Sequence, residues 1–392
     1  MLRAGEHVVI AGVTTRAFAG SAARAGYRVT AVDGFGDLDL RALADVIALT
    51  RESGGFTPGA AADAARRVTA GLAAYTSNFE NYPDAVAELA AGRRLLGNSP
   101  AVLRAVRDPL ALMRTLSSRG FPTPLTRASA PRAARAGAWL LKPRRSGGGH
   151  GTRPWRPGYS VPRSAYLQQR IPGVPGSIVF LADGRRIFPL GLTRQLVGER
   201  GFGATGYRYC GSLLGSARAP LFHDEPSLRE AARGLAEAVT DAFGLVGLNG
   251  IDFIAQGGVP WPIEVNPRPC ASMELVERAG SPPLFALHAP ACDGRLPAGG
   301  ARFPEPRGVA GKAVVFARRT VTVGRFPRGL LGSAADVPHP GERFDRGQPI
   351  CTLYSEGEDG GACLRNLAAR AQTLYAALEP SEARIEAGVA AV

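Results

Sequence analysis

Two carboxylates and one carboxamide occur at a spacing that predicts a shared surface. Residues 250–266 have the composition of a β-hairpin around the loop Gly257-Gly258-Val259. A three-residue loop sets Asp252 directly opposite Glu264, and Asn266 shares their face because side chains alternate along a strand. The opposite face is apolar and is expected to enter a core: Ile251, Phe253, Ile263 and Val265. Facing carboxylates repel each other unless a cation lies between them, and oxygen ligands suit Mg²⁺. The hairpin therefore predicts a metal site, with a solvent-facing polar surface as the alternative.

A lysine and a glycine-rich turn together suit an anion. Lys142 lies near the end of the expected strand 139–143, and a turn that we call the flap follows: Ser146, Gly147, Gly148, Gly149, His150 and Gly151. Glycines allow backbone amides to point at a phosphate, and a lysine adds a point charge. The lysine precedes the glycines, so this is not a P-loop. We predict phosphate binding here, and a surface loop without a ligand is the alternative.

Two arginines are further candidates. Arg268 follows Asn266 by two residues, and Arg194 ends the strand of an expected hairpin over 177–192. A guanidinium group binds a carboxylate or phosphate through two parallel hydrogen bonds, so either residue could neutralise a transferring phosphoryl group. A surface arginine without such a role is the alternative for each.

The first part of the chain has the pattern of an α/β domain. Residues 7–11 and 27–32 are expected strands around one helix, and helical patterns follow at 38–50, 58–74 and 84–92. This order is typical of a Rossmann-like domain. The turn Gly12-Val13-Thr14 lacks the glycines of a dinucleotide fingerprint, which disfavours a nicotinamide-dependent dehydrogenase.

The remaining elements surround the chemical motifs. A connector is expected at 128–137, a strand at 166–171, a long helix at 225–243, and a β-rich tail that ends in a helix at 362–378. Helices capped by Ser99 and Asp108 are expected to precede the connector.

Taken in order, these motifs resemble the ATP-grasp superfamily over roughly residues 95–290. The matching parts are Lys142, the flap, the hinge Gln168-Gln169-Arg170-Ile171, and the hairpin Asp252…Glu264-Val265-Asn266-Pro267-Arg268. The resemblance implies an α/β, ATP-grasp fold with a Rossmann-like N-terminal domain and a small β-rich C-terminal domain. The expected boundaries are 1–97 for the N-terminal domain, 98–172 for the small lobe, 173–298 for the large lobe and 299–392 for the C-terminal domain.

The same resemblance implies a ligase. ATP would lie under the hinge, the flap and Lys142 would hold its phosphates, and Asp252, Glu264 and Asn266 would carry one or two Mg²⁺ ions, with Mn²⁺ as a substitute. The resemblance casts Lys142, Arg194 and Arg268 as catalytic residues that join a small-molecule acid to an amine through an acylphosphate. The tail is similar to that of tyramine–glutamate ligases of methanofuran-type cofactor synthesis.

The chain departs from the family pattern in the helix before the flap. The family often has a basic residue directly after an aspartate there, but Asp108 is followed by Pro109. That role is empty or passes to Arg107 or Arg104. A carboxylate for the ribose hydroxyls is not identifiable near Ile171.

Two other functions stay open. A biotin-carboxylase-like enzyme would use bicarbonate as the acid, and its ADP release would depend on bicarbonate. A nucleotide- or polyanion-binding protein without activity would show steeply salt-dependent binding to nucleic acid and no nucleotide hydrolysis.

Composition limits the partners. The chain has 392 residues, 45% hydrophobic content and a net charge of +14, but only Lys142 and Lys312 are lysines and its arginines are scattered. We therefore expect no nucleic-acid partner, and no apolar run is long enough for a membrane span. Five cysteines without metal-site spacing predict reduced thiols, and with them a cytoplasmic protein. A homodimer is the expected assembly, as the commonest symmetric one.

Overall fold

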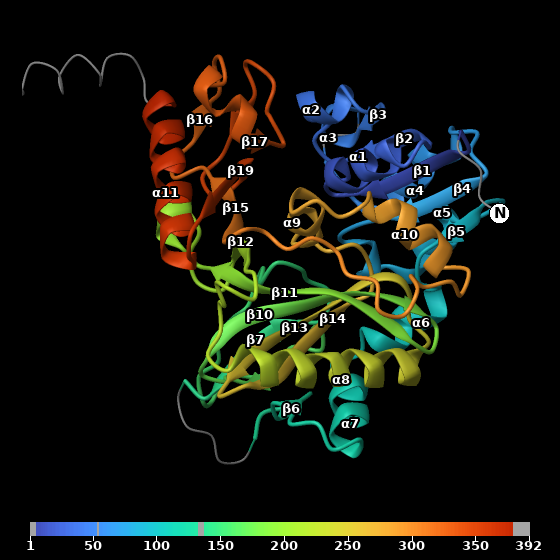
Figure 1. The fold of residues 1–392 in the computed structure, drawn as a ribbon, viewed down its shortest axis with the longest axis vertical. Coiled ribbons are helices and arrows are strands. Elements are labelled where there is room, and N and C mark those ends of the chain that lie inside the picture. The colour runs from blue at the N-terminus through green and yellow to red at the C-terminus, as the bar shows by residue number, and fades with distance from the viewer. Residues whose placement is uncertain (1–4, 53–54, 132–136, 379–392) are drawn as a thin grey trace, which may run out of the picture.

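The computed structural model describes residues 5–52, 55–131 and 137–378. Its N-terminal part holds a five-stranded parallel sheet of order β3-β2-β1-β4-β5. The strands are β1 (His7–Gly12), β2 (Arg28–Asp33), β3 (Asp45–Ala48), β4 (Leu72–Tyr75) and β5 (Arg94–Leu96). The helices are α1 (Arg16–Arg24), α2 (Leu38–Arg41), α3 (Leu49–Glu52), α4 (Pro58–Arg66), α5 (Pro83–Leu89) and the 3-10 helix η1 (Phe79–Asn81). The parallel order confirms the predicted Rossmann-like start, drawn in blue in Figure 1.

Two strands of this sheet lie where the sequence pattern predicts helix. β3 occupies the middle of the expected helix 38–50, and β4 ends the expected helix 58–74. Both predictions are wrong. β4 is apolar throughout, so local periodicity does not separate it from a buried helical turn, whereas β3 is a short edge strand that begins with the exposed Asp45.

Helices α6 (Pro100–Val106) and α7 (Pro109–Ser118) begin as predicted. The side chains of Ser99 and Asp108 accept hydrogen bonds from amides in the first turn of each helix. These caps satisfy donors that the helix itself leaves unpaired.

The small lobe follows as an antiparallel sheet of order β6-β9-β7-β8. Its strands are β6 (Thr126–Arg127), β7 (Trp139–Pro143), β8 (Arg153–Pro154) and β9 (Ala165–Gln169). Trp139, Trp155 and Leu167 give the lobe a hydrophobic core of its own. Residues 132–136 of the expected connector lie outside the described residues.

A larger sheet forms the centre of the molecule, with the order β14-β13-β10-β11-β12-β15-β19-β17. Its strands are β10 (Val174–Asp183), β11 (Ile187–Val197), β12 (Tyr209–Leu214), β13 (Val246–Gln256), β14 (Val259–Asn266), β15 (Val309–Phe316), β17 (Ala334–Ala335) and β19 (Pro349–Gly357). Helix α8 (Glu225–Phe243) covers one face, and α10 (Leu284–Ala291) lies on the other, towards the N-terminal sheet (Figure 1). The C-terminal strands therefore continue the sheet of the large lobe.

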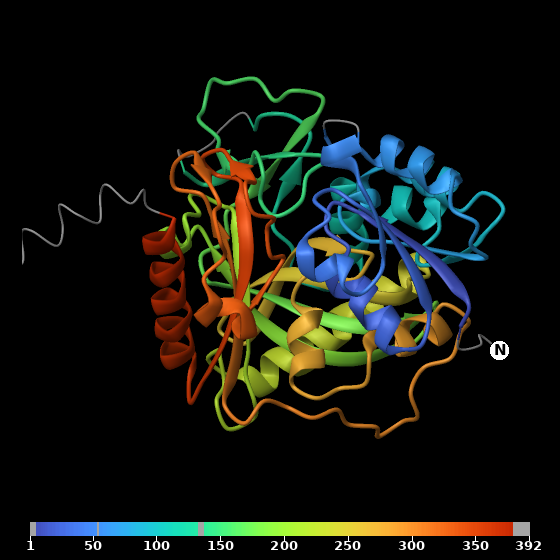
Figure 2. The ribbon, with the colours of Figure 1, turned by 90° about the horizontal axis from the view of Figure 1, so that it is seen from above.

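The C-terminal part packs on the far end of this sheet. It adds α11 (Gly360–Ala377), β16 (Val321–Thr322), β18 (Arg343–Phe344) and the 3-10 helix η3 (Arg328–Ser333), while η2 (Arg200–Phe202) precedes β12. The short helix α9 (Met273–Arg278) follows β14. Seen from above, the small lobe, the N-terminal sheet and the C-terminal strands surround one central region (Figure 2).

One hydrophobic core joins the N-terminal sheet to the centre. Phe18 of α1 packs against Phe285 of α10, with ring centroids 4.9 Å apart. All five cysteines are free thiols, as predicted. Within the described residues, no helix has both the length and the apolar character needed to cross a membrane.

Candidate active site

The predicted metal hairpin is formed by β13 and β14. Asp252 pairs directly with Glu264, as predicted, but the connecting turn is the two residues Gly257-Gly258 and not three. A β-bulge directly after Asp252 inserts one extra residue, Ile263, which restores the expected pairing at the carboxylates. Because of the bulge, Ile263 lines the cavity beside Glu264 and does not join the apolar core.

The two carboxylates have different polar partners. Asp252 accepts hydrogen bonds from Gln195 (2.9 Å) and Asn266 (3.1 Å). Burial, and then the charge of Glu264, raise the pKa of the Asp252 carboxyl. Burial also opposes ionisation of Glu264, but nearby positive charge outweighs it and lowers the pKa of that carboxyl. The charge comes from Arg107, Lys142 and Arg268.

Lys142 projects from β7 towards this hairpin. Its Nζ donates to Gln168 on the adjacent strand β9 over 3.1 Å, and Gln168 Nε2 donates to the main-chain oxygen of Ile263 over 3.3 Å. Gln168 is buried, so it links the lysine to the metal hairpin. The next three hinge residues, Gln169, Arg170 and Ile171, line the cavity.

The flap connects β7 to β8 and lies against the large lobe. The main-chain amide of Tyr209 donates to the main-chain oxygen of Gly148. The main-chain oxygen of Ser146 accepts from the side chains of Asn81 (3.3 Å) and Arg107 (3.1 Å). Gly149 has φ +73°, and a Cβ there would lie 1.8 Å from the Tyr207 oxygen. Only glycine fits this approach. In the described structure the amides of the three consecutive glycines form no hydrogen bond, which leaves them free for an anion. His150 is exposed and lines the same cavity.

Arg268 is held at the end of the hairpin by a residue that the sequence did not indicate. Its Nη2 lies 2.9 Å from Glu80 and also donates to the Asn266 side-chain oxygen over 3.2 Å. Glu80 is fully buried on η1 of the N-terminal domain, so its charge needs this partner. Arg268 also lines the cavity, where it faces any bound anion.

Arg107 and Arg104 lie in different environments. Arg107 lies 3.3 Å from Glu264 and donates to the Val265 oxygen over 2.9 Å. Arg104 pairs with Asp84, and both side chains are mostly exposed. Of the two, Arg107 therefore belongs to the site, where it supports the metal hairpin and the flap.

The structure does not bring Arg194 to the site. Gln195 lines the cavity, and consecutive residues of β11 point to opposite faces, so Arg194 points away from the cavity. The sequence indicated Arg194 as a catalytic candidate without assigning it a face of the strand, and this residue is not among those that line the cavity. The residue at the site is its neighbour Gln195, which strand alternation could have indicated.

One cavity of about 1020 Å³ is lined by Lys142, the flap, the hinge, Arg268 and the hairpin residues Asp252, Glu264 and Asn266. It runs from the hinge and the flap past Asp252 and Arg268 to the N-terminal domain and the C-terminal strands. This volume is at the upper end for ligand sites, so it has room for a nucleotide and a second molecule.

The oxygen donors of the hairpin fit a hard divalent ion. Asp252, Glu264 and Asn266 present two carboxylates and an amide oxygen, the ligand type of Mg²⁺. Among the described residues, no group of three or more His, Cys, Asp or Glu side chains could hold a metal by itself. An ion here would thus share its coordination with oxygens from a ligand such as a phosphate.

Comparisons with known proteins agree with this site. Residues 106–272 match the model of the ATP-grasp domain. An uncharacterised protein of Methanocaldococcus jannaschii is 26% identical over 118 residues, which are 30% of this chain and 28% of that protein. The chain therefore spans little more than a quarter of that relative.

Solved structures extend the likeness to nearly the whole chain. The biotin carboxylase domain of Hydrogenobacter thermophilus 2-oxoglutarate carboxylase, solved with MgADP, ADP and bicarbonate, has a TM-score of 0.70 at 14% identity, covering 96% of this chain and 91% of that one. N5-carboxyaminoimidazole ribonucleotide synthetase of Thermus thermophilus has a TM-score of 0.67 at 19% identity, covering 94% and 98%.

The domain match and the fold define the class of protein. Residues 106–272 form an ATP-grasp domain, flanked by the N-terminal and C-terminal parts that the solved ATP-grasp structures also have. The chain thus contains an ATP-grasp domain within a fold that extends over nearly its whole length.

Proposed function

We propose that the chain is an ATP-dependent ligase that joins a carboxylic acid to an amine. A carboxylate oxygen of the acid attacks the γ-phosphorus of ATP, and the bond to ADP breaks. The amine nitrogen then attacks the acyl carbon of the acylphosphate, phosphate leaves, and the nitrogen loses a proton. The products are an amide, ADP and phosphate.

One observation carries this proposal. A glycine-rich flap, a lysine, a two-carboxylate hairpin and an arginine all line the same cavity, which continues beyond them. Phosphoryl transfer depends on positioning and charge neutralisation more than on covalent catalysis, and these groups supply both.

Each group has a role that its position supports. Lys142 and the flap bind the phosphates of ATP, and the hinge residues Gln169, Arg170 and Ile171 bind adenine. Arg268 binds the acid and stabilises the charge on the transferring group. Asp252, Glu264 and Asn266 hold Mg²⁺, which neutralises phosphate charge when it is bound. The closed flap excludes water, which would hydrolyse an acylphosphate.

A carboxylase that uses bicarbonate is the second candidate. It is favoured by the likeness to the biotin carboxylase domain solved with bicarbonate. The two functions differ in the acid. ADP release that depends on bicarbonate and on no other acid would identify the carboxylase.

The first test is a thermal-shift titration with ATP, with and without Mg²⁺. A ligand at about 100 times its dissociation constant stabilises by roughly 2.7 kcal/mol, a shift of a few degrees. We expect a magnesium-dependent shift that Glu264→Ala weakens. Glu237→Ala is the control, because Glu237 pairs with Arg233 on an exposed face of α8. Absence of any nucleotide shift in the wild type would contradict the proposal.

The remaining expectations concern assembly, location, the metal ion and the pathway. The Hydrogenobacter domain was crystallised as a dimer, and we propose a homodimer for this chain, measurable by light scattering. Cytoplasmic location and the use of Mn²⁺ in place of Mg²⁺ stay predictions. A role in methanofuran-type cofactor synthesis has no support from the comparisons, so the acid and the amine must be found by screening for ADP release.

A further inference from the structure

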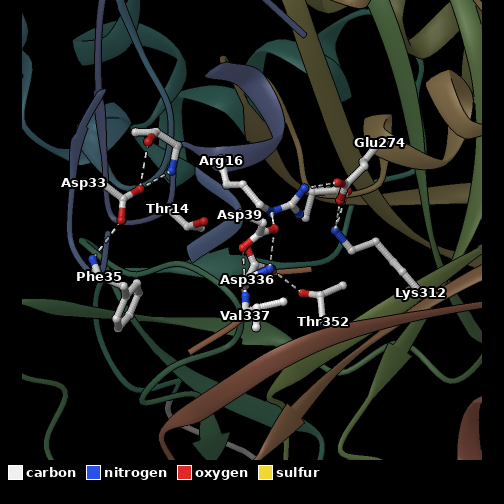
Figure 3. A network of polar contacts seen from close by, with 12 residues as sticks. Thr14, Arg16, Asp33, Phe35, Asp39, Glu274, Lys312, Asp336, Val337 and Thr352 are labelled. Carbon is white, nitrogen blue, oxygen red and sulfur yellow. Dashed lines mark hydrogen bonds and ion pairs between the residues drawn. The ribbon is translucent and has the colours of Figure 1, made fainter. Parts of the chain in front are cut away.

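The far end of the cavity lies between the N-terminal and C-terminal parts. We call this junction the seam and define it as residues 33–39 together with 336–342. The side chain of Asp39 accepts hydrogen bonds from the amides of Asp336 (3.0 Å) and Val337 (2.9 Å), as Figure 3 shows. His339 Nε2 lies 2.9 Å from the main-chain oxygen of Gly36. Contacts on both sides thus fix the two segments relative to each other.

Most carboxylates of the seam have their own donors. Asp33 accepts from the amide and hydroxyl of Thr15 and from the amides of Phe35 and Gly36. Asp336 accepts from Arg16 over 2.7 Å and from the Thr352 hydroxyl over 2.5 Å. These acids serve the structure of the seam.

Asp37 is the exception. It is only 6% exposed and lines the cavity, and within the described residues its carboxylate has neither a hydrogen-bond donor nor an ion-pair partner. Burial is the largest reason that the pKa of Asp37 is raised, to about 9, and four neighbouring carboxylates add to it: Asp336, Asp33, Asp39 and Glu342.

The cations nearby are engaged elsewhere. Arg16 contacts Asp336, Asp39 and Glu274. Arg41 donates through Nε to the main-chain oxygen of Gly36 over 3.0 Å. Buried carboxylates of one sign that outnumber their cations create a strongly negative potential at the one carboxylate left without a partner. A cation from outside the chain is the missing partner.

Apolar side chains also line the cavity in the region of the seam. Phe35 lies two residues before Asp37 and also lines the cavity. Across the seam, Ile350 shares a face of β19 with Thr352, and both of these residues line the cavity as well. An anionic group beside apolar walls suits an ammonium group on an apolar stem, and it suits a fully hydrated ion less well.

We propose that Asp37 binds the ammonium group of the amine substrate, a primary amine with an apolar stem, at the seam end of the cavity. This inference rests on the proposed ligase function, because it assigns the second substrate of that reaction. The amine and the nucleotide share this cavity with Arg268. The ammonium group loses one proton to the Asp37 carboxylate before the nitrogen attacks the acylphosphate, and the nitrogen loses a second proton when the amide forms.

The test is a thermal-shift titration of the full chain with hexylamine and 2-phenylethylamine, in the presence of Mg-ADP. Hexanol and 2-phenylethanol are the uncharged matches. We expect both amines, and neither alcohol, to stabilise the wild type. Asp37→Asn should lower amine affinity at least tenfold and leave the ATP shift unchanged. It should also fold, because the raised pKa of Asp37 keeps the carboxyl protonated when no cation is bound, and a carboxamide has the same shape as that neutral group. Asp37→Ser is a second variant with the same expectation.

The outcomes separate the inference from the proposed function. Equal amine responses in the wild type and both variants would overturn the inference, as would no amine response in a wild type that still binds ATP. Stabilisation by CaCl2 that Asp37→Asn abolishes, without an amine response, would identify a metal site and also overturn it. An amine shift that depends on Asp37, in a protein that binds no ATP, would support the amine site and remove the ligase proposal.

Discussion

The Arg107 guanidinium lies 3.3 Å from the Glu264 carboxylate, and the same side chain donates to the Ser146 oxygen in the flap. One arginine from the helical segment before the small lobe therefore contacts both the β13–β14 hairpin and the flap. Its charge also helps to lower the pKa of Glu264, which keeps that carboxyl ionised.

Arg107→Ala is expected to weaken Mg-ATP binding by about tenfold, or roughly 1.4 kcal/mol, because a buried hydrogen-bonded charge pair is lost. Isothermal titration of Mg-ATP is the measurement. Arg104→Ala is the matched control, since Arg104 lies in the same helical segment but pairs with exposed Asp84. Exposed ion pairs contribute little to stability, so we expect Arg104→Ala to change the affinity for Mg-ATP less than twofold. Equal effects of the two substitutions would show that Arg107 has no special role.

The flap offers a second matched pair of substitutions. Gly149→Ala would set a Cβ 1.8 Å from the Tyr207 oxygen at a φ of +73°, so the flap must leave its contact with the large lobe. Gly147→Ala meets nothing within 4 Å. We expect Gly149→Ala to reduce ATP-dependent ADP release at least tenfold and Gly147→Ala to reduce it less than threefold, with Tm values within a few degrees of the wild type. If both variants keep full activity, closure of the flap does not limit the reaction.

The sequence predicted the hairpin pairing at the site but not its turn. Asp252 and Glu264 were placed opposite each other by assuming a three-residue loop, and a bulge at Ile263 compensates for the shorter turn. Strand alternation puts Arg194 on the same face as the apolar Leu192 and Leu196, which are buried, and so leaves Gln195 to face the cavity. The Rossmann-like start and the long helix α8 followed from local patterns, whereas the ATP-grasp fold followed from the resemblance of the ordered motifs to that superfamily.

The seam could not be predicted in the same way. Asp37 and Asp336 come from distant parts of the chain, and each has an ordinary loop sequence around it. Their proximity depends on how the N-terminal sheet packs against β17 and β19, which no local pattern encodes. Glu80 was missed for the same reason, since only the folded chain places it beside Arg268.

Arg16 is expected to be a main support of the seam. It is buried and pairs with Glu274 over 2.5 Å and with Asp336 over 2.7 Å, as Figure 3 shows. Arg16→Met would leave both carboxylates without this partner, and breaking a buried pair costs about 3–5 kcal/mol. We expect a clear fall in Tm by circular dichroism. Arg233→Met is the control, because Arg233 pairs with Glu230 and Glu237 on an exposed helix face, and a Tm change below 1–2 °C is expected there.

His288 is expected to make the fold sensitive to mild acid. Its Nδ1 accepts from the Leu248 amide over 2.8 Å and its Nε2 lies 3.1 Å from the Leu96 oxygen, so the ring must be neutral to serve both. Burial lowers the pKa of His288 to about 4. Between pH 6.5 and about 4 the unfolded chain therefore binds a proton that the folded chain does not, and the free energy of unfolding decreases as the pH falls. The change over this window is about 3 kcal/mol.

Thermal melts from pH 7 to pH 4 test this prediction. His288→Gln keeps an acceptor and a donor in similar places but does not titrate, so its Tm should fall less steeply with acid than that of the wild type. His150→Gln is the control, since His150 is exposed in the flap and its substitution should leave the slope unchanged. If the wild type and His288→Gln lose stability in parallel, another group is responsible for the acid sensitivity. If only His288→Gln resists acid, protonation of His288 causes the loss of stability. The ring links Leu96 of β5 to Leu248 of β13, so acid would then break the contact between the N-terminal sheet and the central sheet.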